Sequence, residues 1–302
     1  MEVGQLRALR ELRDRGSIAA VAQAMHVTPS SVSQQLSALA RAAGCALTYR
    51  DGRRTALTDA GRALAAAAVR VESALGSATE AVKQFQQQPA GRVSIAAYHS
   101  ASWALFPALL ERFNEPDGIE LLLSDEDVAQ QHFPRLTADY DLVIGHRLQG
   151  GAQWPATVHV EPLFLEPLDI AMPAGHRLAK RQVLQVADLR GEAWLAVHDG
   201  FPLRGAIEQI AGINGETAKI VHRINEFYVA ARVVEAAACI SLMPRFTVDQ
   251  TRYPGLVMRP LEFPQLGRQV DCLMRPEALT RGNVRAVLGA LREISASLSQ
   301  GV

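Results

Sequence analysis

The sequence predicts an α/β protein with an all-α N-terminal part and a larger C-terminal part of alternating strands and helices. Three observations support this fold class. Two short helical segments precede an Arg-rich turn, a long heptad-like pattern follows that turn, and short apolar runs alternate with amphipathic segments after residue 91. A chain of 302 residues exceeds the usual length of one domain, so at least two domains are expected.

The composition is that of a folded globular chain whose two parts carry opposite net charge. Hydrophobic residues make up 48% of the sequence, and no apolar run reaches the roughly 20 residues that a membrane-spanning helix requires. Residues 1–90 hold 11 basic and 7 acidic side chains, whereas the remainder holds 20 and 24. The N-terminus lacks the apolar stretch of a secretory signal, so we expect a cytoplasmic protein with no membrane partner.

Two short helices joined by a tight turn are predicted after a first amphipathic helix that ends at Gly16. The first helix carries an apolar residue at every third position: Val3, Leu6, Leu9 and Leu12. Ser17 is expected to cap the second helix, and Thr28 followed by Pro29 is a start signal for the third, which extends to about Ala43. This pair of helices forms a helix-turn-helix unit.

The third helix has one apolar face and one polar face that is almost free of charge. Such a face suits hydroxyl and amide groups that reach base edges and phosphates, whereas an ordinary solvated helix is richer in Lys and Glu. The candidate DNA-contacting residues of this helix and its cap are Thr28, Pro29, Ser30, Ser31, Ser33, Gln34 and Ser37. The alternative is an exposed polar helix that binds nothing.

An Arg-rich hairpin is predicted directly after the helix pair. Two strand-like runs flank the dipeptide DG, which is a strong turn signal, and Arg50, Arg53 and Arg54 cluster at the tip. Long cations in this position can neutralise phosphates or enter the minor groove beside the recognition helix. The hairpin therefore completes a winged helix-turn-helix over residues 1–57, although an Arg-rich turn elsewhere is usually solvated surface.

A single long helix is predicted from Thr58 to about Gln87. Its apolar residues recur at alternating intervals of four and three: Leu64, Ala68, Val71, Leu75, Ala78, Val82 and Phe85. This spacing is typical of a coiled-coil seam, so we expect dimerisation through this helix, and packing against its own domain is the alternative. The QQQPAG segment is expected to be a hinge that closes a linker region of residues 58–90.

Short apolar runs alternate with helical patterns from residue 91 onward. The predicted strands are RVSIAAY, IELLLS, DLVIG, LDIAM, AWLAV and CISLM, and the helical stretches include Trp103–Phe113, 204–212, 226–238 and about Arg281–Leu298. This alternation predicts parallel sheets covered by helices.

The ordered set of these motifs resembles the LysR-type transcriptional regulators over essentially the whole chain. The landmarks include TPSSVSQQL, Arg50, Arg54, and later GRVSIAAY, DLVIG, EPLDIAMPAGHRLA and SLMP. The resemblance implies a winged helix-turn-helix, a linker helix that dimerises, and a two-lobed effector-binding domain at residues 91–302 that is similar to periplasmic binding proteins. Two chain crossings would place lobe 1 at about 91–163 and 267–302, and lobe 2 at about 164–266.

The same resemblance implies the partners. They are a double-stranded DNA operator, a small-molecule effector, RNA polymerase, and further copies of the chain in a homodimer that assembles into a homotetramer. No cofactor is implied. Many members carry Arg where this chain has Gln34, which can still make a two-point contact with adenine. A Gly common in lobe 2 is replaced around Ala238 and Cys239, and we expect this change to narrow the ligand pocket.

Small molecules bind open α/β sheets at the carboxyl ends of strands, so strand ends predict the effector site. The candidates are Tyr98, His99, Ser100, Ala101, Ser102, His146, His198, Phe201, Arg204, Asn225 and Phe227. Ser100 and Ser102 are expected to precede a helix that begins near Trp103, whose free amides favour an anionic metabolite, and simple capping is the alternative. The three histidines of this set can meet in the cleft, but no metal is predicted because none has a second ligand at helical spacing.

Two other function classes stay open. One is a DNA-binding regulator whose C-terminal domain binds no ligand and serves protein interaction. The other is an enzyme on a two-lobed scaffold, but the sequence lacks GxSxG, HExxH, Walker and dinucleotide motifs, so no enzyme is predicted. Cys45, Cys239 and Cys272 lie far apart without a basic cluster, which argues against a redox sensor.

Overall fold

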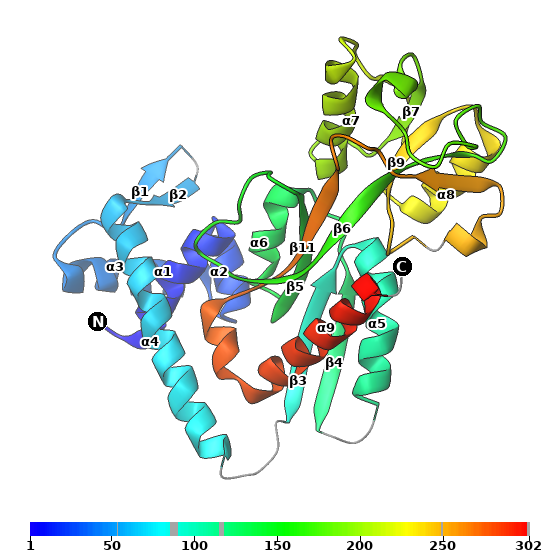
Figure 1. Ribbon diagram of the computed structural model, residues 1–302. Coiled ribbons are helices and arrows are strands. Elements are labelled where there is room, and N and C mark those ends of the chain that lie inside the picture. Colours follow the sequence, from blue (N-terminus) through cyan, green and yellow to red (C-terminus); the bar gives the residue numbers. More distant parts are fainter. Residues whose placement is uncertain (53, 85–89, 115–117, 249, 301–302) are drawn as a thin grey trace.

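The computed structural model describes residues 1–302 except 53, 85–89, 115–117, 249 and 301–302. Figure 1 shows an N-terminal helical domain with a hairpin, one long helix, and a two-lobed α/β part. The lobes are joined by two neighbouring strands, β6 and β11 (Figure 1). This arrangement agrees with the predicted fold class.

The N-terminal domain is a winged helix-turn-helix. Its elements are α1 (Val3–Arg15), α2 (Ile18–Ala24), α3 (Pro29–Ala43), β1 (Thr48–Asp51) and β2 (Arg54–Leu57). The Ser17 hydroxyl accepts the backbone N–H of Ala20 at 3.2 Å, and the Thr28 hydroxyl accepts that of Ser31 at 3.2 Å. α1 ends at Gly16, whose φ of 74° suits glycine. The predicted caps and helix ends are therefore present, and each side-chain cap contributes about 1 kcal/mol.

Helix α4 (Asp59–Gln84) packs against the N-terminal domain near its start and exposes apolar residues farther along. Near its start Ala65 and Ala68 are buried in the core of the N-terminal domain. Farther along, Val71, Leu75 and Val82 are 38, 48 and 66% exposed. The predicted seam is therefore wrong for its first third, because Ala68 packs against its own domain. The apolar positions that follow stay accessible, while Phe85 and residues 86–89 of the predicted hinge lie outside the described residues.

Lobe 1 is a sheet covered by helices. Its elements are β3 (Gly91–Ala97), α5 (His99–Arg112), β4 (Ile119–Asp125), η1 (Gln130–His132), α6 (Phe133–Leu136), β5 (Leu142–Leu148), η4 (Pro276–Thr280) and α9 (Gly282–Gln300), together with β11 (Gly267–Met274). Strands β3, β4 and β5 are parallel, and their apolar residues share one core with α5 and α9. β5 is buried along most of its length, as its continuous apolar run indicates, whereas β4 lies at the edge of the sheet and mixes buried and exposed residues.

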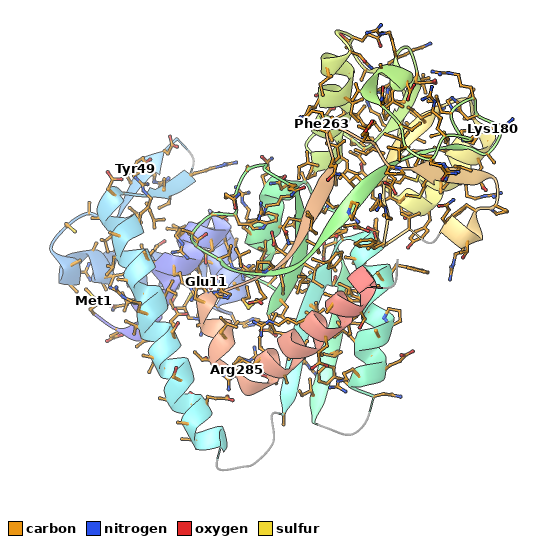
Figure 2. The ribbon with its side chains drawn as sticks, viewed as in Figure 1. Met1, Glu11, Tyr49, Lys180, Phe263 and Arg285 are labelled. Atoms are coloured by element: carbon orange, nitrogen blue, oxygen red, sulfur yellow. The ribbon has the colours of Figure 1, made fainter. Side chains whose placement is uncertain are left out.

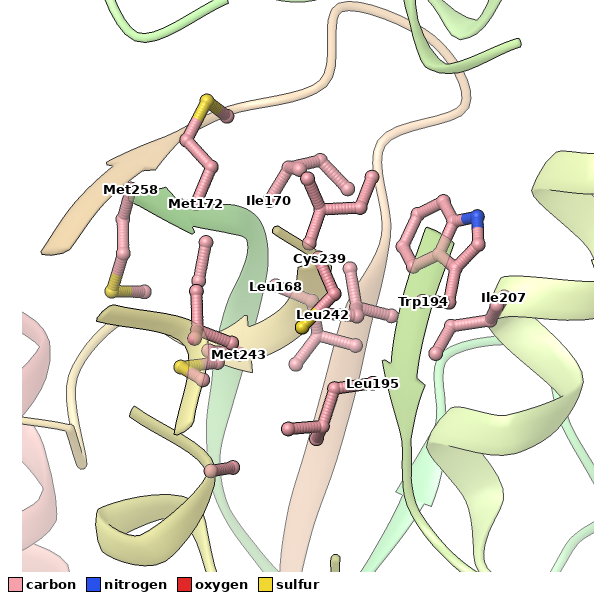
Figure 3. Close-up of a cluster of buried hydrophobic side chains, with 14 of the residues drawn as sticks. Leu168, Ile170, Met172, Trp194, Leu195, Ile207, Cys239, Leu242, Met243 and Met258 are labelled. Carbon is pink, nitrogen blue, oxygen red and sulfur yellow. The ribbon is translucent and has the colours of Figure 1, made fainter. Parts of the chain in front are cut away.

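Lobe 2 has a separate hydrophobic core. Its elements are β6 (His159–Pro173), η2 (Val186–Leu189), β7 (Ala193–Ala196), α7 (Pro202–Ile213), β8 (Lys219–Arg223), α8 (Phe227–Ala236), β9 (Ile240–Pro244), η3 (Gln250–Arg252) and β10 (Leu256–Arg259). Figure 3 shows Cys239 inside this core with Leu168, Leu195 and Leu242. The expectation that Cys239 narrows the ligand pocket is therefore wrong, because its side chain faces the interior of the lobe.

The nine-stranded sheet is mixed, with strand order β4-β3-β5-β11-β6-β9-β7-β8 and β10 beside β6. Within each lobe neighbouring strands are parallel, whereas β11 and β6 are antiparallel to each other and to β5, β9 and β10. The prediction of purely parallel sheets is wrong at these crossing strands, since each lobe is closed by a chain segment that returns from the other lobe. β6 pairs with β11 up to Pro167 and with β9 from Leu168, so one strand belongs to both lobes.

A network of ion pairs attaches α1 to lobe 1. Arg10 is only 2% exposed, and its guanidinium bridges Glu72 of α4 at 2.6 Å and Glu277 of η4. Arg275 reaches Glu11 at 2.7 Å and Asp14 at 3.0 Å from the lobe 1 side. Figure 2 labels Glu11 where the N-terminal helices meet lobe 1. The charged face of α1 is thus a domain interface.

Arginine charges hold the carboxylate of Glu11 in its ionised form. Burial alone would raise the pKa of Glu11, but hydrogen bonds and positive charge from Arg275 and Arg15 lower it to about 2. Arg15 also donates to Asp139 and to the carbonyl of Ala138, each at 2.7 Å. The carboxylate of Glu11 is therefore ionised at neutral pH, whereas burial raises the pKa of Glu72. We name this interface the junction: α1 residues 10–15, Glu72, residues 138–139 and residues 275–277.

A glycine permits α4 to lie close to η4. A Cβ atom at Gly76 would come within 2.5 Å of the Thr280 hydroxyl. One turn later, Glu80 accepts the backbone N–H of Gly282 at 2.7 Å. The sequence pattern gave no signal for this contact, because Gly76 looks like an ordinary interruption of a helix.

Candidate nucleic-acid interface and interlobe crevice

The polar face of α3 is open to solvent. The exposed candidates on this face and its cap are Thr28, Pro29, Ser30, Ser33, Gln34 and Ser37, while Ser31 is half-buried. Ser33 and Ser37 each donate a hydroxyl hydrogen bond to a backbone carbonyl four residues earlier, at 3.0 and 2.8 Å. These bonds leave the hydroxyl lone pairs and the Gln34 amide available. The opposite face, with Val32, Leu36 and Leu39, packs into the domain core.

The hairpin extends beside α3 as a wing. β1 and β2 pair antiparallel from Thr48 with Leu57 to Asp51 with Arg54. Arg50 and Arg54 are exposed on it, while Arg53 lies outside the described residues. A polar helix face together with two exposed arginines is typical of the groove and phosphate contacts of winged helices.

A small crevice lies between the lobes. Seven sequence candidates line it: Tyr98, His99, Ser100, His146, Phe201, Asn225 and Phe227. The lining also includes Asp127, Val197, Leu203 and Arg268, which strand-end reasoning missed. The Asn225 amide of lobe 2 donates to Asp127 of lobe 1 at 3.1 Å, so the lobes touch across the opening. The remaining cavity is about 20 Å³, room for about one water molecule.

Helix α5 begins four residues earlier than predicted. It starts at His99 with Tyr98 as its N-cap, so Ser100 and Ser102 lie inside its first turn and not before a helix at Trp103. Neither serine caps the helix. Ser102 donates to the carbonyl of Ala97 at 2.9 Å, and Ser100 accepts from Arg268 at 3.0 Å. The missing side-chain cap explains the error, because no polar residue marks the true start.

Four further candidates lie outside the crevice lining. Ala101 and Ser102 are buried on the inner side of α5. His198 is exposed, and its backbone N–H donates to the Asn225 side chain at 2.9 Å. Arg204 lines a different hollow, where it pairs with Glu208 at 2.8 Å.

Arg268 is the central polar side chain of the crevice. It is fully buried on β11 and forms an ion pair with Glu166 of β6, at 2.7 Å, in which both side chains are inaccessible. The Nη2 atom of Arg268 also donates to the Thr247 hydroxyl at 2.8 Å. The guanidinium carbon lies over the rings of Tyr98 and Phe227, 4.9 and 5.7 Å from their centroids. Glu166 in turn accepts the backbone N–H groups of residues 246 and 247. The Arg268–Glu166 pair therefore links the two crossing strands, β11 and β6, to each other. Through Ser100 and Thr247 it also contacts both lobes.

Three polar atoms of the crevice lack a hydrogen-bond partner among the described residues. They are the Tyr98 hydroxyl, His146 Nδ1 and Arg268 Nη1. Burial, with a smaller contribution from Arg268, lowers the pKa of His146 well below its usual value, and burial raises the pKa of Tyr98. His146 is therefore neutral and Tyr98 protonated at pH 7. Buried groups of this kind are normally satisfied, and the space beside the three atoms is about the size of one water molecule.

The described histidines and the two buried cysteines lie apart from one another. His99 pairs with Asp125, His146 packs against the Tyr98 ring at 4.4 Å, and His198 stays apart. No cluster of three metal-ligating side chains occurs among the described residues. Burial raises the pKa of both Cys239 and Cys272, which keeps them as thiols.

Family models match both the N-terminal and the C-terminal part of the chain. The model described as "Bacterial regulatory helix-turn-helix protein, lysR family" matches residues 3–62, and the "LysR substrate binding domain" matches residues 86–296. The transcriptional dual regulator GltC of Bacillus subtilis is 25% identical over 274 residues, which is 90% of each chain. The transcriptional dual regulator OxyR of Escherichia coli is 25% identical over 294 residues, covering 97% of this chain and 95% of OxyR.

Solved structures support the same fold. Full-length OxyR C199D from Pseudomonas aeruginosa superposes with a TM-score of 0.65 at 21% identity, covering 98% of this chain and 94% of the other. CbnR in complex with its target DNA superposes with a TM-score of 0.55 at 19% identity, covering 98% of this chain and 100% of CbnR. The two-part fold and the two family models define a DNA-binding regulator with a separate effector-binding domain. The chain belongs to the LysR family, as the resemblance in its sequence predicted, and it is a DNA-binding transcriptional regulator with an effector-binding domain.

Within the described residues, no helix is both long and apolar enough to cross a membrane.

Proposed function

We propose that α3 and the wing contact operator DNA, and that a small anionic metabolite bound in the interlobe crevice alters operator binding or bending. The observation that carries the DNA part is the exposure of the polar face of α3 together with Arg50 and Arg54. Hydroxyl and amide groups supply base-edge contacts, and the two arginines supply phosphate contacts. We place the protein in the cytoplasm and assign it regulation and not catalysis.

The wing is tested by Arg50→Ala combined with Arg54→Ala. On a duplex selected from a random pool by the wild-type protein, we expect weaker binding to every sequence and a salt-dependence slope reduced by about two units, because two phosphate contacts are lost. Fluorescence anisotropy at several salt concentrations measures both quantities. Arg177→Ala, an exposed arginine of lobe 2, is the control. An unchanged slope in the double variant would show that the wing assignment is wrong.

The effector part rests on the three unpartnered atoms of the crevice. The Tyr98 hydroxyl and Arg268 Nη1 are donors that a carboxylate or similar anion can accept, while Phe201 and Phe227 supply apolar walls. The cavity holds only about one water as it stands, so a metabolite requires the lobes to part or Phe227 to move. Ligand binding would then change the lobe arrangement, which is the step that couples it to DNA.

Tyr98→Phe tests the crevice without disturbing its packing. The hydroxyl has no partner among the described residues, so we expect the free protein to keep its melting temperature. In a thermal-shift screen of small organic acids, a ligand at about 100 times its dissociation constant adds about 2.7 kcal/mol to the wild type, and Tyr98→Phe should lose most of that gain. A ligand that stabilises both proteins equally would place binding elsewhere. A uniformly negative screen would favour a ligand-free protein-interaction domain.

The proposed assembly is a homodimer through the exposed part of α4, paired into a homotetramer on a bent operator. Val71, Leu75 and Val82 form an apolar strip that water does not favour. A bend in the operator would place the protein beside RNA polymerase.

A further inference from the structure

A hollow beside the junction is separate from the interlobe crevice. It has a volume of about 550 Å³ and lies between α1 and the surface of lobe 1 formed by η1, α6 and the segment 152–158. Three arginines from distant parts of the sequence, Arg13, Arg135 and Arg275, line it together with Asp14, Gln131 and Trp154. We call this hollow the junction pocket. Its volume is in the range of small-molecule sites, about 300–1,000 Å³.

We infer that the junction pocket binds a small planar organic anion, and that this ligand ties the DNA-binding domain to lobe 1. The inference does not depend on what occupies the interlobe crevice. It rests on the charge, the flat aromatic wall and the two-domain origin of the pocket.

The pocket has an excess of positive charge. Asp14 is its single lining carboxylate, and it is already engaged by Arg13 at 2.7 Å and by Arg275 at 3.0 Å. Arg135 is exposed and makes no ion pair within the described part of the chain. The Nε atom of Arg275 is buried without a hydrogen-bond partner among the described residues. Outside the lining, Glu11 also pairs with Arg275 and Asp139 pairs with Arg15, so Arg135 is the lining arginine without a carboxylate partner among the described residues.

A rigid aromatic side chain forms one wall. Trp154 is half-buried, and its indole N–H donates to the inaccessible carboxylate of Asp271 at 2.6 Å. Phe133 meets the indole edge-on, with ring centroids 6.3 Å apart. These contacts fix the plane of the indole, so a planar ring can stack on the remaining accessible surface while its acidic group faces the arginines.

Both the DNA-binding domain and lobe 1 contribute residues to the junction pocket. Ligand binding and the packing of α1 on lobe 1 therefore depend on each other. Arg13 and Asp14 come from α1, whereas Arg135 and Trp154 come from lobe 1. A ligand that contacts both sets binds the docked arrangement better than a separated one, and it shifts the population toward docking. The ligand therefore restrains the position of the DNA-reading helix relative to the effector domain.

The test uses 8-anilinonaphthalene-1-sulfonate as a planar anion, and N-phenyl-1-naphthylamine as the same ring system without the charge. We expect the full-length protein to bind one molecule of the sulfonate per chain, followed by its fluorescence. Arg13→Ala and Arg135→Ala should each weaken this binding about tenfold, as the loss of one charge-assisted hydrogen bond predicts. Arg135→Lys should lose less. Affinity for the neutral amine should be unchanged in the arginine variants and reduced in Trp154→Leu, which removes the stacking wall.

Arg135→Ala keeps the test valid if Arg13→Ala disturbs the junction, because Arg135 is exposed and makes no ion pair within the described residues. Arg177→Ala serves as the surface control. Hydrogen exchange supplies a second measurement, since the sulfonate should slow exchange in residues 3–15 of the wild type. The inference is overturned if Arg135→Ala binds the sulfonate like the wild type, or if exchange in α1 does not respond. Operator binding, measured without ligand, should be normal in Arg135→Ala, which separates this test from the test of the wing.

Discussion

Replacing Arg268 by Met is expected to lower the free energy of unfolding of the effector domain by about 3–5 kcal/mol, the usual cost of stranding one partner of a buried ion pair. Met fills a similar volume, so the loss arises from electrostatics and not from a cavity. Glu166 would keep its two backbone N–H donors but lose its only cationic partner among the described residues. Its carboxylate would then be inaccessible to water and uncompensated.

Urea unfolding followed by tryptophan fluorescence measures this change. All three tryptophans, Trp103, Trp154 and Trp194, belong to the effector domain, so the signal reports on that domain alone. The matched control is Arg92→Met, which breaks the exposed Arg92–Glu120 pair, 3.0 Å long, between two strands of lobe 1. That change should cost about 0–1 kcal/mol. Equal losses in the two variants would contradict the central role of Arg268.

The double variant Glu166→Gln with Arg268→Met separates charge from packing. Gln can still accept the backbone N–H groups of residues 246 and 247, and no buried charge remains. We therefore expect the double variant to be more stable than Arg268→Met alone. A strictly additive loss would mean that the pair is not coupled.

Introducing charge on the exposed strip of α4 is expected to produce monomers. Leu75→Glu combined with Val82→Glu places two like charges on each copy of the proposed dimer seam, where they would face a partner's charges. Because two linked DNA-binding domains bind far more tightly than one, operator affinity should fall by about 10²–10⁴. Sedimentation velocity measures the mass, and anisotropy on the selected duplex measures the affinity.

Ser77→Glu is the matched control for the dimer. Ser77 is exposed on the same helix but lies outside the strip, and its hydroxyl bonds only to the carbonyl of Ser73 within the described residues. This variant should remain dimeric and bind the operator normally. If the Leu75 and Val82 double variant also remained dimeric, the subunit contact would have to lie elsewhere.

The structure of the N-terminal domain could be predicted because it is specified by short-range signals in the sequence. Ser17, Thr28 and Pro29 act within a few residues of their own position, so caps and helix starts can be read without knowledge of the rest of the chain. The same holds for the wing, whose turn is encoded by a dipeptide. Where the local signal was missing, as at the start of α5, the predicted boundary was displaced.

The crevice and the junction depend on long-range contacts and could be predicted only in part. Strand ends pointed to Tyr98, Ser100 and Phe227, because sheet geometry brings such positions together. Arg268 gave no signal of its own, since its importance comes from Glu166, 102 residues earlier in the sequence. The buried state of Arg10 likewise depends on Glu277, which is 267 residues away.

Helix α4 contacts lobe 1 near its C-terminal end, where Gly76 faces Thr280 and Glu80 accepts the N–H of Gly282, while its other end carries the DNA-binding domain. From Glu80 back to Asp59 the helix spans about 32 Å at its ordinary rise per residue. A tilt of about 5° at the lobe 1 end would move the wing end by about 3 Å, close to the ~3.4 Å between stacked bases of one strand. A tilt of this size is therefore comparable with the step from one base pair to the next.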